Sequence, residues 1–382
     1  MESHIDVNAC SSRLTVDLDA LRANYRTIAD RVAPARCGAV VKANAYGLGI
    51  ARVAPALYRE GCRTFFVAQL CEAEPLARAI GPDAAIFILN GPDPGSEARF
   101  AHAGFLPVLG SRSQLDRWRS LARAEGRALP AALQIDSGMS RLGLPPAEAA
   151  ALAADSVLGR EIDVRLLMTH LACADEPERA ANAEQWTRFE TVRTHFPAVP
   201  ASIANSGGAF LPPAFHHDLV RPGIALYGAD PGPHAEGLRP VVRLDARVIQ
   251  IRAIAAGAGV GYGLDHIAAA PQRLATLALG YGDGWPRSLG GVGAAWHRGA
   301  RLPIAGRVSM DSLTVDITAL PDGALVEGDF VELLGPSQSL ADVALDAGTI
   351  AYEILTRLGT RHARAYVEDG VVTHSIAAGE RP

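Results

Sequence analysis

Residues 39–49, AVVKANAYGLG, decide the fold of this chain. Ala39, Val40 and Val41 form a short run of small and β-branched residues, which is typical of a strand buried on both faces. Lys42 closes the run. Burial removes the hydration of an ammonium and lowers its pKa, so a lysine here can be a neutral amine that condenses with a carbonyl. The alternative is a strand-end lysine whose amine reaches solvent past its apolar stem.

Short apolar runs alternate with helical patterns downstream of this stretch. We expect eight strands, at residues 39–42, 64–69, 85–89, 105–109, 131–136, 164–169, 200–204 and 219–227. We expect helices between them, for example at 111–125 and 177–196, and one before them that starts after Asp17. Eight such units predict a (β/α)8 TIM-like barrel rather than an open doubly wound sheet. No GxGxxG follows the first strand, so a dinucleotide-binding domain has little support.

The composition changes after Gly237. Further strands are expected at 241–254, 274–279, 313–317, 330–334, 363–367 and 371–376, with short helices at 340–347 and 349–358. We therefore predict two domains: a barrel domain at 1–238, which includes an N-terminal leader strand at 13–17, and a mostly β C-terminal domain at 239–382.

Reactive residues of a βα barrel gather just after its strands, at the C-terminal face. The expected strands are followed there by Lys42, by residues 136–141 (DSGMSR), by His170 and by Asn205 with Ser206, while Arg221 lies in the eighth strand. In residues 205–208, NSGG, small side chains leave backbone N–H groups free to hold an anion, although such a string is also common in an ordinary capped turn. Arg221 needs an acceptor at a defined place, because a core strand normally excludes arginine.

Overall composition narrows the partners. The 382 residues carry a net charge of −5 and no basic stretch, which argues against nucleic acid and membrane surfaces and favours a small-molecule substrate. Five cysteines without a CxxC argue against disulfides and zinc, and His170 with Cys173 lacks convergent partners for a metal. Glu2 and Asp6 stand where a signal peptide would be basic and then apolar, so we expect a cytoplasmic protein.

The string VVKANAYGLG resembles the pyridoxal-phosphate lysine motif of the alanine racemase family. The resemblance extends over residues 13–366. Further matching strings are GVGYG with Tyr262, LGYGDGWPR with Tyr281, GRVSMD with Met310 and Asp311, and AYEIL with Tyr352. The resemblance implies pyridoxal 5'-phosphate as cofactor, bound covalently by Lys42. It implies cofactor contacts from Tyr46, His170, Asn205, Ser206, Arg221, Gly223, Ile224 and Tyr352, and substrate contacts from Arg141, Tyr281, Met310 and Asp311.

The same resemblance implies an isomerase that interconverts L-alanine and D-alanine, either to supply D-alanine for peptidoglycan or to degrade it. Lys42 would serve the D-face and Tyr262 the L-face, because racemisation needs an acid/base on each side of the α-carbon. It also implies a homodimer with shared active sites. The alternatives are a racemase that prefers serine or a broad range of amino acids, a non-catalytic pyridoxal-phosphate binding protein, and a decarboxylase of related fold.

Two positions depart from the family pattern. Ser309 stands where a cysteine is common, and Gln134 where many members have a carbamylated lysine that holds the arginine matching Arg141. Glutamine cannot be carbamylated, so Arg141 needs another acceptor. The amide carbonyl of Gln134 and a small anion such as chloride are the two open alternatives.

Overall fold

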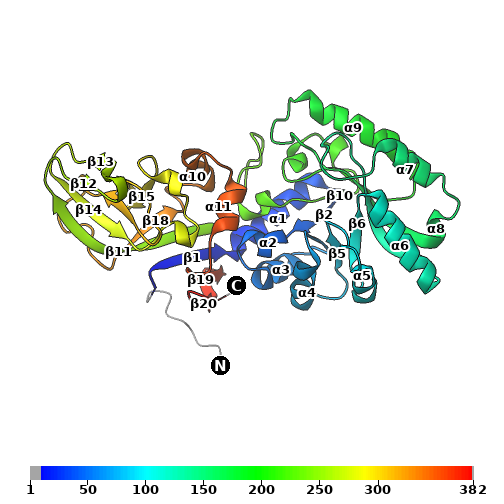
Figure 1. Ribbon diagram of the computed structural model, residues 1–382, viewed down its shortest axis with the longest axis horizontal. Helices are drawn as coiled ribbons and strands as arrows, with labels where there is room; N and C mark the ends of the chain where they lie inside the picture. The colour runs from blue at the N-terminus through cyan, green and yellow to red at the C-terminus, as the bar shows by residue number, and fades with distance from the viewer. Residues whose placement is uncertain (1–9, 381–382) are drawn as a thin grey trace.

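The computed structural model describes residues 10–380 of the chain. Glu2 and Asp6, on which we based the expectation of no signal peptide, lie outside the described residues. Two lobes make up the molecule, a barrel of strands and helices and a smaller β lobe (Figure 1).

Seven parallel strands form the wall of the barrel in sequence order. They are β3 (Ala39–Val40), β4 (Thr64–Val67), β5 (Ala85–Ile88), β6 (Leu106–Leu109), β7 (Leu129–Gln134), β8 (Ile162–Met168) and β9 (Ala201–Ser202). An eighth, β10 (Leu219–Val220), pairs in parallel with β2 (Arg36–Cys37), which leads directly into β3. On the other side of β10, the Arg221 N–H donates to the Ala204 carbonyl at 3.0 Å. These bonds close the ring, so the predicted barrel is confirmed.

Helices cover the outside of the barrel and bury part of their surface against it. They are α1 (Leu18–Val32), α3 (Ile50–Arg59), α4 (Leu70–Ala79), α5 (Glu97–Ala103), α6 (Arg112–Glu125), α7 (Pro146–Ala153), α8 (Leu158–Glu161) and α9 (Ala180–Arg193). Asp17 and Ser111 cap α1 and α6 by accepting backbone N–H groups, as predicted. The helix expected at 177–196 is shorter at both ends.

The first and the eighth predicted strands end earlier than expected. The strand expected at 219–227 stops at Val220, since Pro222 has no N–H to give to a ladder, and Ile224–Tyr227 form a 3-10 turn, η3. Arg221 therefore follows the strand instead of lying in it. Likewise β3 stops at Val40, and Lys42 begins the short helical turn α2 (Lys42–Tyr46).

The β lobe is built on a nine-stranded sheet in the order β16-β15-β18-β11-β1-β19-β20, with β14 and β17 attached through β11. One of the nine strands, β1 (Ser12–Asp17), comes from the start of the chain. The others are β11 (Val242–Ile254), β14 (Gln272–Leu277), β15 (Ala294–His297), β16 (Ala300–Pro303), β17 (Leu313–Asp316), β18 (Phe330–Leu334), β19 (Ala363–Glu368) and β20 (Val371–Ile376). Two helices, α10 (Leu340–Ala347) and α11 (Ala351–Arg357), complete it. The mostly β C-terminal part is therefore confirmed, although the β15–β16 hairpin was not predicted.

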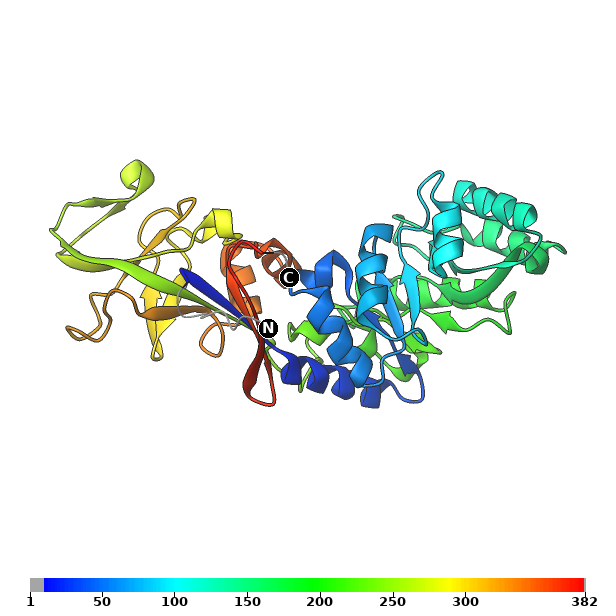
Figure 2. The same ribbon diagram turned by 90° about the horizontal axis from the view of Figure 1, so that it is seen from below.

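The leader strand β1 (Ser12–Asp17) belongs to this second sheet. It lies between β11, which it pairs antiparallel, and β19, which it pairs in parallel. We had grouped this strand with the barrel, because an alternating pattern indicates a strand but not its partner. Figure 2 shows β1 beside β11, which extends to the far end of the β lobe. The boundary between 238 and 239 stays a prediction.

The two lobes share one apolar core. A single cluster of buried side chains includes Trp118 in the barrel and Trp285 in the β lobe. Tyr366 of β19 is fully buried, and its hydroxyl donates to the Leu48 carbonyl, just after α2, at 2.8 Å. The β lobe is thus fixed against the segment that carries Lys42.

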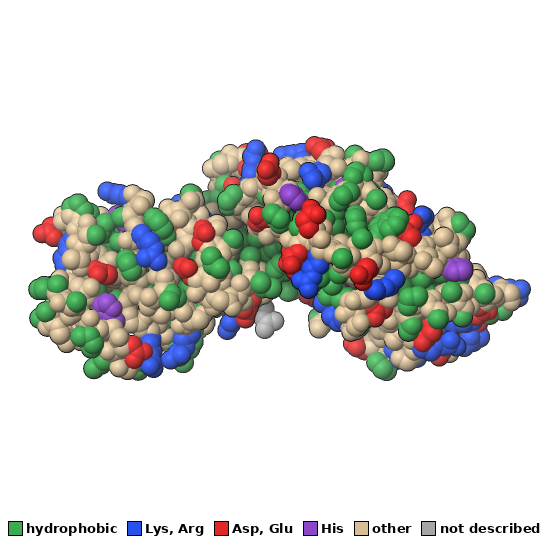
Figure 3. Space-filling view, turned by 90° about the horizontal axis from the view of Figure 1, so that it is seen from above, with side chains coloured by type: hydrophobic (Ala, Val, Ile, Leu, Met, Phe, Trp, Pro, Cys, Tyr) green, Lys and Arg blue, Asp and Glu red, His purple; other side chains and the backbone are tan. Residues whose placement is uncertain are grey.

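On the face shown in Figure 3, acidic and basic side chains are interspersed over both lobes. In residues 10–380 no helix combines the length and the hydrophobicity that a membrane span requires. The same residues contain no group of three or more His, Cys, Asp and Glu side chains arranged to bind a metal.

Candidate active site

Lys42 stands at the C-terminal end of β3, at the start of an unusual turn. The four residues that follow it, Ala43 to Tyr46, all have positive φ angles of 53–55°. Left-handed backbone of this kind costs about 1–2 kcal/mol per L-residue, so it persists only where surrounding contacts hold it. The Gly47 N–H donates to the Ala43 carbonyl at 2.7 Å and closes the turn. The turn places the side chains of Lys42 and Tyr46 in the same hollow.

Two side chains stabilise this turn. The Asn44 Oδ1 accepts from the Ile50 N–H at 2.8 Å and so joins the turn to α3. The Glu72 Oε1 accepts from the Ala43 N–H at 2.5 Å. Glu72 is also the third residue of α4, whose capping box it completes. The sequence signal for a capping box could have located Glu72, but not its contact with the lysine turn.

The hollow at the C-terminal face of the barrel collects nearly all predicted cofactor residues. It is lined by Val40, Lys42, Tyr46, Leu89, His170, Asn205, Ser206, Arg221, Gly223 and Tyr352. Ile224 is absent from the lining and is fully buried behind Gly223. Val40 and Leu89 were not predicted; Val40 ends β3 and Leu89 directly follows β5, and nothing in their pattern distinguishes these apolar residues from core residues.

The environment of Lys42 favours the neutral amine. Burial lowers the pKa of its ammonium, and the positive charge of Arg141 lowers that pKa further, while Glu72 opposes both. A neutral amine is the nucleophilic form that attacks a carbonyl.

Arg221 and His170 form the polar floor of the hollow. Arg221 is buried, and its guanidinium donates to Ser202 Oγ and, at 2.7 Å, to the Thr169 carbonyl. Its Nη2 also lies 3.5 Å from His170 Nδ1, which serves as the acceptor when the histidine proton is on Nε2. Burial lowers the pKa of Arg221 to about 9, so the group remains a cation at neutral pH.

His170 is neutral in this setting. Burial, followed by the charge of Arg221, lowers the pKa of His170 to about 3. It can therefore orient Arg221 without adding a second positive charge to the floor.

The wall opposite the floor can hold an anion. The Ser206 Oγ accepts from the Gly223 N–H at 2.8 Å, which joins the loop after β9 to the loop after β10. The Asn205 Oδ1 accepts from the Gly208 N–H at 3.0 Å and closes the turn within the loop after β9. Burial raises the pKa of Tyr352 to about 12 and that of Tyr46 as well, so both phenols keep their protons and can donate them.

This donor set fits a phosphate. Among the described residues that line the hollow there is no carboxylate, and hydroxyl, phenol and amide donors surround a cationic arginine. A doubly charged phosphate needs such donors, together with backbone that can approach it closely. With Lys42 as the only amine in the lining, the hollow suits an aldehyde that bears a phosphate.

Tyr262 lies far from this hollow in the same chain. It begins the turn η4 (Tyr262–Leu264), next to the hairpin β12–β13 (Gly259–Val260 and His266–Ile267) at the end of the β lobe remote from the barrel (Figure 1). Its side chain is 73% exposed. One chain alone therefore does not bring Lys42 and Tyr262 together.

The predicted substrate residues Tyr281, Met310 and Asp311 are also in the β lobe. Tyr281 and Met310 are exposed, at 41% and 54%, on turns that touch each other. The Met310 N–H has no acceptor within residues 10–380, so it is free to bind a ligand. The Asp311 carboxylate is directed to Arg361, whose Nη1 donates to it at 2.8 Å. Sequence reasoning missed Arg361, because an isolated arginine carries no pattern.

Gln134 ends β7 and is buried next to the loop that holds Arg141. Its amide Nε2 donates to the Leu142 carbonyl at 3.3 Å. Across the described part of the chain, no hydrogen bond joins Gln134 to Arg141.

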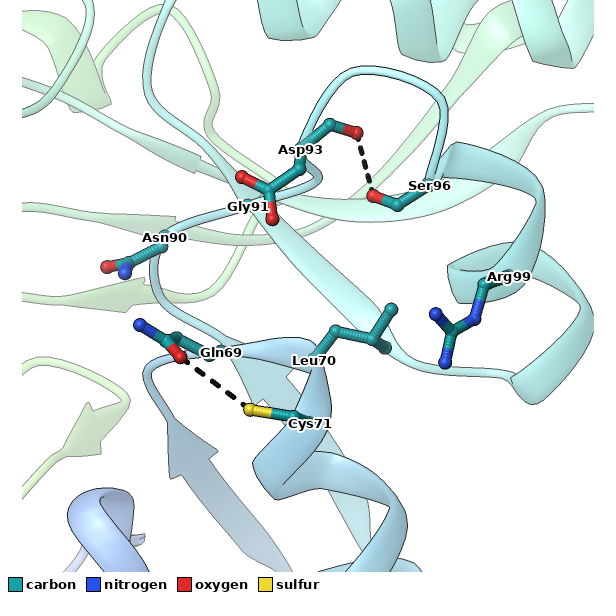
Figure 4. A pocket seen from close by; sticks show the side chains of 8 residues that line it. All are labelled: Gln69, Leu70, Cys71, Asn90, Gly91, Asp93, Ser96 and Arg99. Atoms are coloured by element: carbon teal, nitrogen blue, oxygen red, sulfur yellow. Dashed lines mark hydrogen bonds between the residues drawn. The ribbon is translucent and has the colours of Figure 1, made fainter.

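A second hollow lies between the loops that follow β4 and β5 (Figure 4). It is lined by Gln69, Leu70, Cys71, Asn90, Gly91, Asp93, Ser96 and Arg99. Its polar groups are already partly paired: Arg99 donates to Glu74 at 2.9 Å, and the Cys71 Sγ lies 3.6 Å from the Gln69 Oε1. It shares no lining residue with the hollow of Lys42.

A βα barrel with a partly buried amine after its first strand, an arginine floor and a phosphate cup defines a class, the barrel proteins that bind pyridoxal phosphate through a lysine. Comparison with known proteins identifies the member. The alanine racemase N-terminal domain matches residues 16–231, and the alanine racemase C-terminal domain matches residues 241–366. The chain belongs to the alanine racemase family and is therefore an isomerase that depends on pyridoxal phosphate.

Its relatives cover nearly the whole chain. It is 54% identical over 360 residues to the catabolic alanine racemase of Mesorhizobium japonicum and 51% identical over 373 residues to the alanine racemase of Brucella canis, with 94% of each chain covered in both cases. The crystal structure of alanine racemase from Bartonella henselae with covalently bound pyridoxal phosphate superposes with a TM-score of 0.91 at 44% identity, over 94% of this chain and all of that one.

Proposed function

We propose that this chain interconverts L-alanine and D-alanine, with Lys42 and Tyr262 as the two acid/base groups. One observation carries the proposal: the partly buried Lys42 amine shares a single hollow with the arginine floor and a wall of phosphate donors. When bound there, pyridoxal phosphate supplies an electron sink that acidifies the hydrogen on the α-carbon of an amino acid.

Residues of the chain bind the cofactor and transfer the protons. Lys42 binds the cofactor, and its amine then takes the α-proton from one face of the substrate or returns it. Tyr262 holds or donates a proton at its phenol oxygen on the opposite face, since inversion needs a group on each side. Arg221 stays protonated and does not give up its proton, which keeps the electron sink weak and favours reprotonation over other outcomes.

Five further residues position the cofactor and the substrate. Tyr46, Tyr352 and Ser206 hold the phosphate at the wall of the hollow. The free N–H of Met310 binds the substrate carboxylate, and the positive charge of Arg141 assists it. With both ends fixed, the α-carbon is held between the two acid/base groups.

The active unit is a homodimer in which each β lobe completes the site of the partner. Tyr262 cannot serve Lys42 of its own chain, and exposed apolar side chains surround it, among them Leu264 and Ile267, at 58% and 56%. Such a surface suits an isologous interface in which the β lobe of one protomer covers the hollow of the other. We place the dimer in the cytoplasm, where it would supply or degrade D-alanine.

The substrate is tested by D/L interconversion across a panel of amino acids. Alanine should be the best substrate. A preference for serine or a broad range would favour the alternative racemases, and the absence of any turnover by a yellow protein would indicate a pyridoxal-phosphate binder. Borohydride reduction should attach the cofactor to the peptide that contains Lys42; the label on another lysine would contradict the assignment.

The two-base mechanism is tested by Tyr262→Phe. This variant should bind the cofactor normally and lose turnover in both directions by about 10²–10⁴-fold, because each net conversion uses both faces. Tyr58→Phe is the matched control, since this phenol bonds to Asp83 on the surface of the barrel. Near-normal turnover by Tyr262→Phe would mean that one base suffices.

A further inference from the structure

We propose that Arg361 is a positioning residue that fixes Met310 and Tyr281 for the substrate by joining the turns that carry them. This inference rests on the proposed function, in which those two residues face the substrate. Arg361 itself reaches the site only through its partners.

The guanidinium of Arg361 spans two carboxylates from different segments. Its Nε donates to the Asp283 Oδ1 at 2.8 Å, and its Nη1 donates to the Asp311 Oδ1 at 2.8 Å. Asp283 ends the turn η5 (Tyr281–Asp283), and Asp311 directly follows Met310. A planar guanidinium with several fixed donors is suited to hold two acceptors at a defined separation.

The two turns also meet through their backbones. The Tyr281 N–H donates to the Ser309 carbonyl at 3.0 Å, and the Gly282 N–H donates to the Met310 carbonyl at 2.8 Å. A Cβ on Gly280 would lie 2.2 Å from the Ser309 carbonyl oxygen, so the approach requires glycine. The Met310 carbonyl is thus engaged, and its free N–H is held in a fixed direction.

Asp283 is the anchored end of this arrangement. Its carboxylate is 7% exposed, and its Oδ2 accepts from the Gly280 N–H at 2.8 Å. Its carbonyl accepts from the Gly359 N–H at 3.0 Å, which ties η5 to the loop just before Arg361. Of the cations in the described residues, only Arg361 forms an ion pair with Asp283.

Asp311 is the adjustable end. Its side chain is 66% exposed, and an ion pair in that setting contributes little to stability. The ion pair matters instead because it neutralises the Asp311 carboxylate and fixes the direction in which that carboxylate points. The Asp311 carboxylate stands one residue from the N–H that binds the substrate carboxylate, and without Arg361 its negative charge would repel that substrate. The predicted role of Asp311 in substrate binding is thereby recast as an indirect one.

The test compares Arg361→Gln with Arg243→Gln. Arg243 is a matched control, because it also bridges two carboxylates in the β lobe, Asp245 and Glu332, and its side chain is 46% exposed against 48% for Arg361. Arg361→Gln should raise the KM for alanine about tenfold and leave kcat within about twofold. The KM of Arg361→Lys should lie between the KM of Arg361→Gln and that of the wild type. A lysine ammonium keeps the positive charge but cannot hold two carboxylates in the fixed planar geometry of a guanidinium.

A second readout does not depend on activity. Backbone amides at 279–284 and 308–312 should exchange hydrogen faster in Arg361→Gln than in the wild type, and Arg243→Gln should show no change there. Unchanged exchange, or a KM equal to that of the control, would overturn the proposal. If the wild type did not racemise alanine, the proposed function would fail while the exchange measurement still decided whether Arg361 joins the turns.

The double variant Arg361→Gln/Asp311→Asn separates the direct from the indirect role of Asp311. If Asp311 acts through Arg361, removing its unpaired charge should leave the KM at or below that of Arg361→Gln. If Asp311 touches the substrate itself, the two increases should multiply, and that result would contradict the proposal.

Discussion

Gly223 and Tyr46 occupy adjoining space so closely that a Cβ on Gly223 would lie 2.2 Å from the Tyr46 hydroxyl oxygen. The backbone of Gly223 does not demand glycine by its φ angle, which is −122°. Space is therefore the constraint: the Gly223 N–H bonds to Ser206, and the phenol of Tyr46 fills the place where a side chain would go. The loop after β10 and the lysine turn are fitted to each other around the phosphate cup.

Gly223→Ala should displace the Tyr46 phenol and weaken cofactor binding. Overpacking of this kind costs about 1–3 kcal/mol, and the lost donor adds to the effect on phosphate affinity. Cofactor retention after dialysis and the dissociation constant of pyridoxal phosphate measure the change. Gly159→Ala is the control, because nothing lies within 4 Å of a Cβ built there. Equal retention by both variants would show that Tyr46 can move without consequence.

The sequence could predict this region only in part. The apolar run before Lys42 and the alternation of strands and helices are local signals, and they were sufficient for the barrel. The left-handed turn of Ala43–Tyr46 has only one local signal, Asn44, because alanine and tyrosine do not favour positive φ. Contacts with Glu72 and α3 hold the turn. Gly223 was predicted from the resemblance to the family. The steric reason for glycine there is the close approach of Tyr46, a residue far away in sequence, so the local sequence does not show it.

The lowered pKa values of two histidines predict that acid decreases the free energy of unfolding. Burial lowers the pKa of His170 to about 3 and that of His362 to about 4, against 6.5 for the free side chain. Below pH 6.5 the unfolded chain binds protons that the folded chain does not. The free energy of unfolding should therefore be unaffected by these groups above pH 6.5 and should decrease as the pH falls from 6.5 toward 4.

Urea unfolding of the cofactor-free protein between pH 7.5 and 4.5 measures this slope. His362→Gln should make it shallower, because the buried ring that bonds to Ser12 and to the Asp283 carbonyl no longer titrates. His234→Gln, at an exposed position, should leave the slope as in the wild type. If His362→Gln does not change the dependence of the free energy of unfolding on pH, groups other than His362 cause the acid sensitivity.

Mixed dimers test whether the sites are shared. Lys42→Ala and Tyr262→Phe are each expected to be inactive, but a hybrid dimer contains one site with both intact residues. Mixing the two variants under conditions of subunit exchange should restore about a quarter of wild-type activity, if exchange is statistical and half of the dimers are hybrids. Absence of recovery despite proven exchange would show that Tyr262 does not act across the interface.

Long-range partners explain most of what the sequence did not predict. The leader strand β1 pairs with β19, about 350 residues away in sequence, and Arg361 bridges the turn that follows β14 and the turn that precedes β17. Periodicity gives the faces of an element and not its neighbours. By contrast, Tyr262 was identified from its motif, and the structure adds that it is exposed and remote from Lys42 of its own chain.

The last prediction concerns the charge beside Arg141. In this structure the Gln134 amide donates its N–H to the Leu142 carbonyl, and across the described residues its carbonyl makes no bond to Arg141. Arg141 adds positive charge near Lys42, enough to lower the pKa of the amine. A cation there without a substrate carboxylate attracts an anion, so we favour chloride over the amide as its acceptor.

Replacing chloride with a bulky organic anion at constant ionic strength should therefore raise the KM for alanine, because Arg141 loses the anion that holds it in place. Bicarbonate should have no effect, since Gln134 has no amine to carbamylate. Gln134→Lys supplies the control: with bicarbonate present, its carbamate should replace chloride and make the KM insensitive to the exchange of anions. A wild-type KM that does not change on anion exchange would leave the amide and ordered water as the acceptors of Arg141.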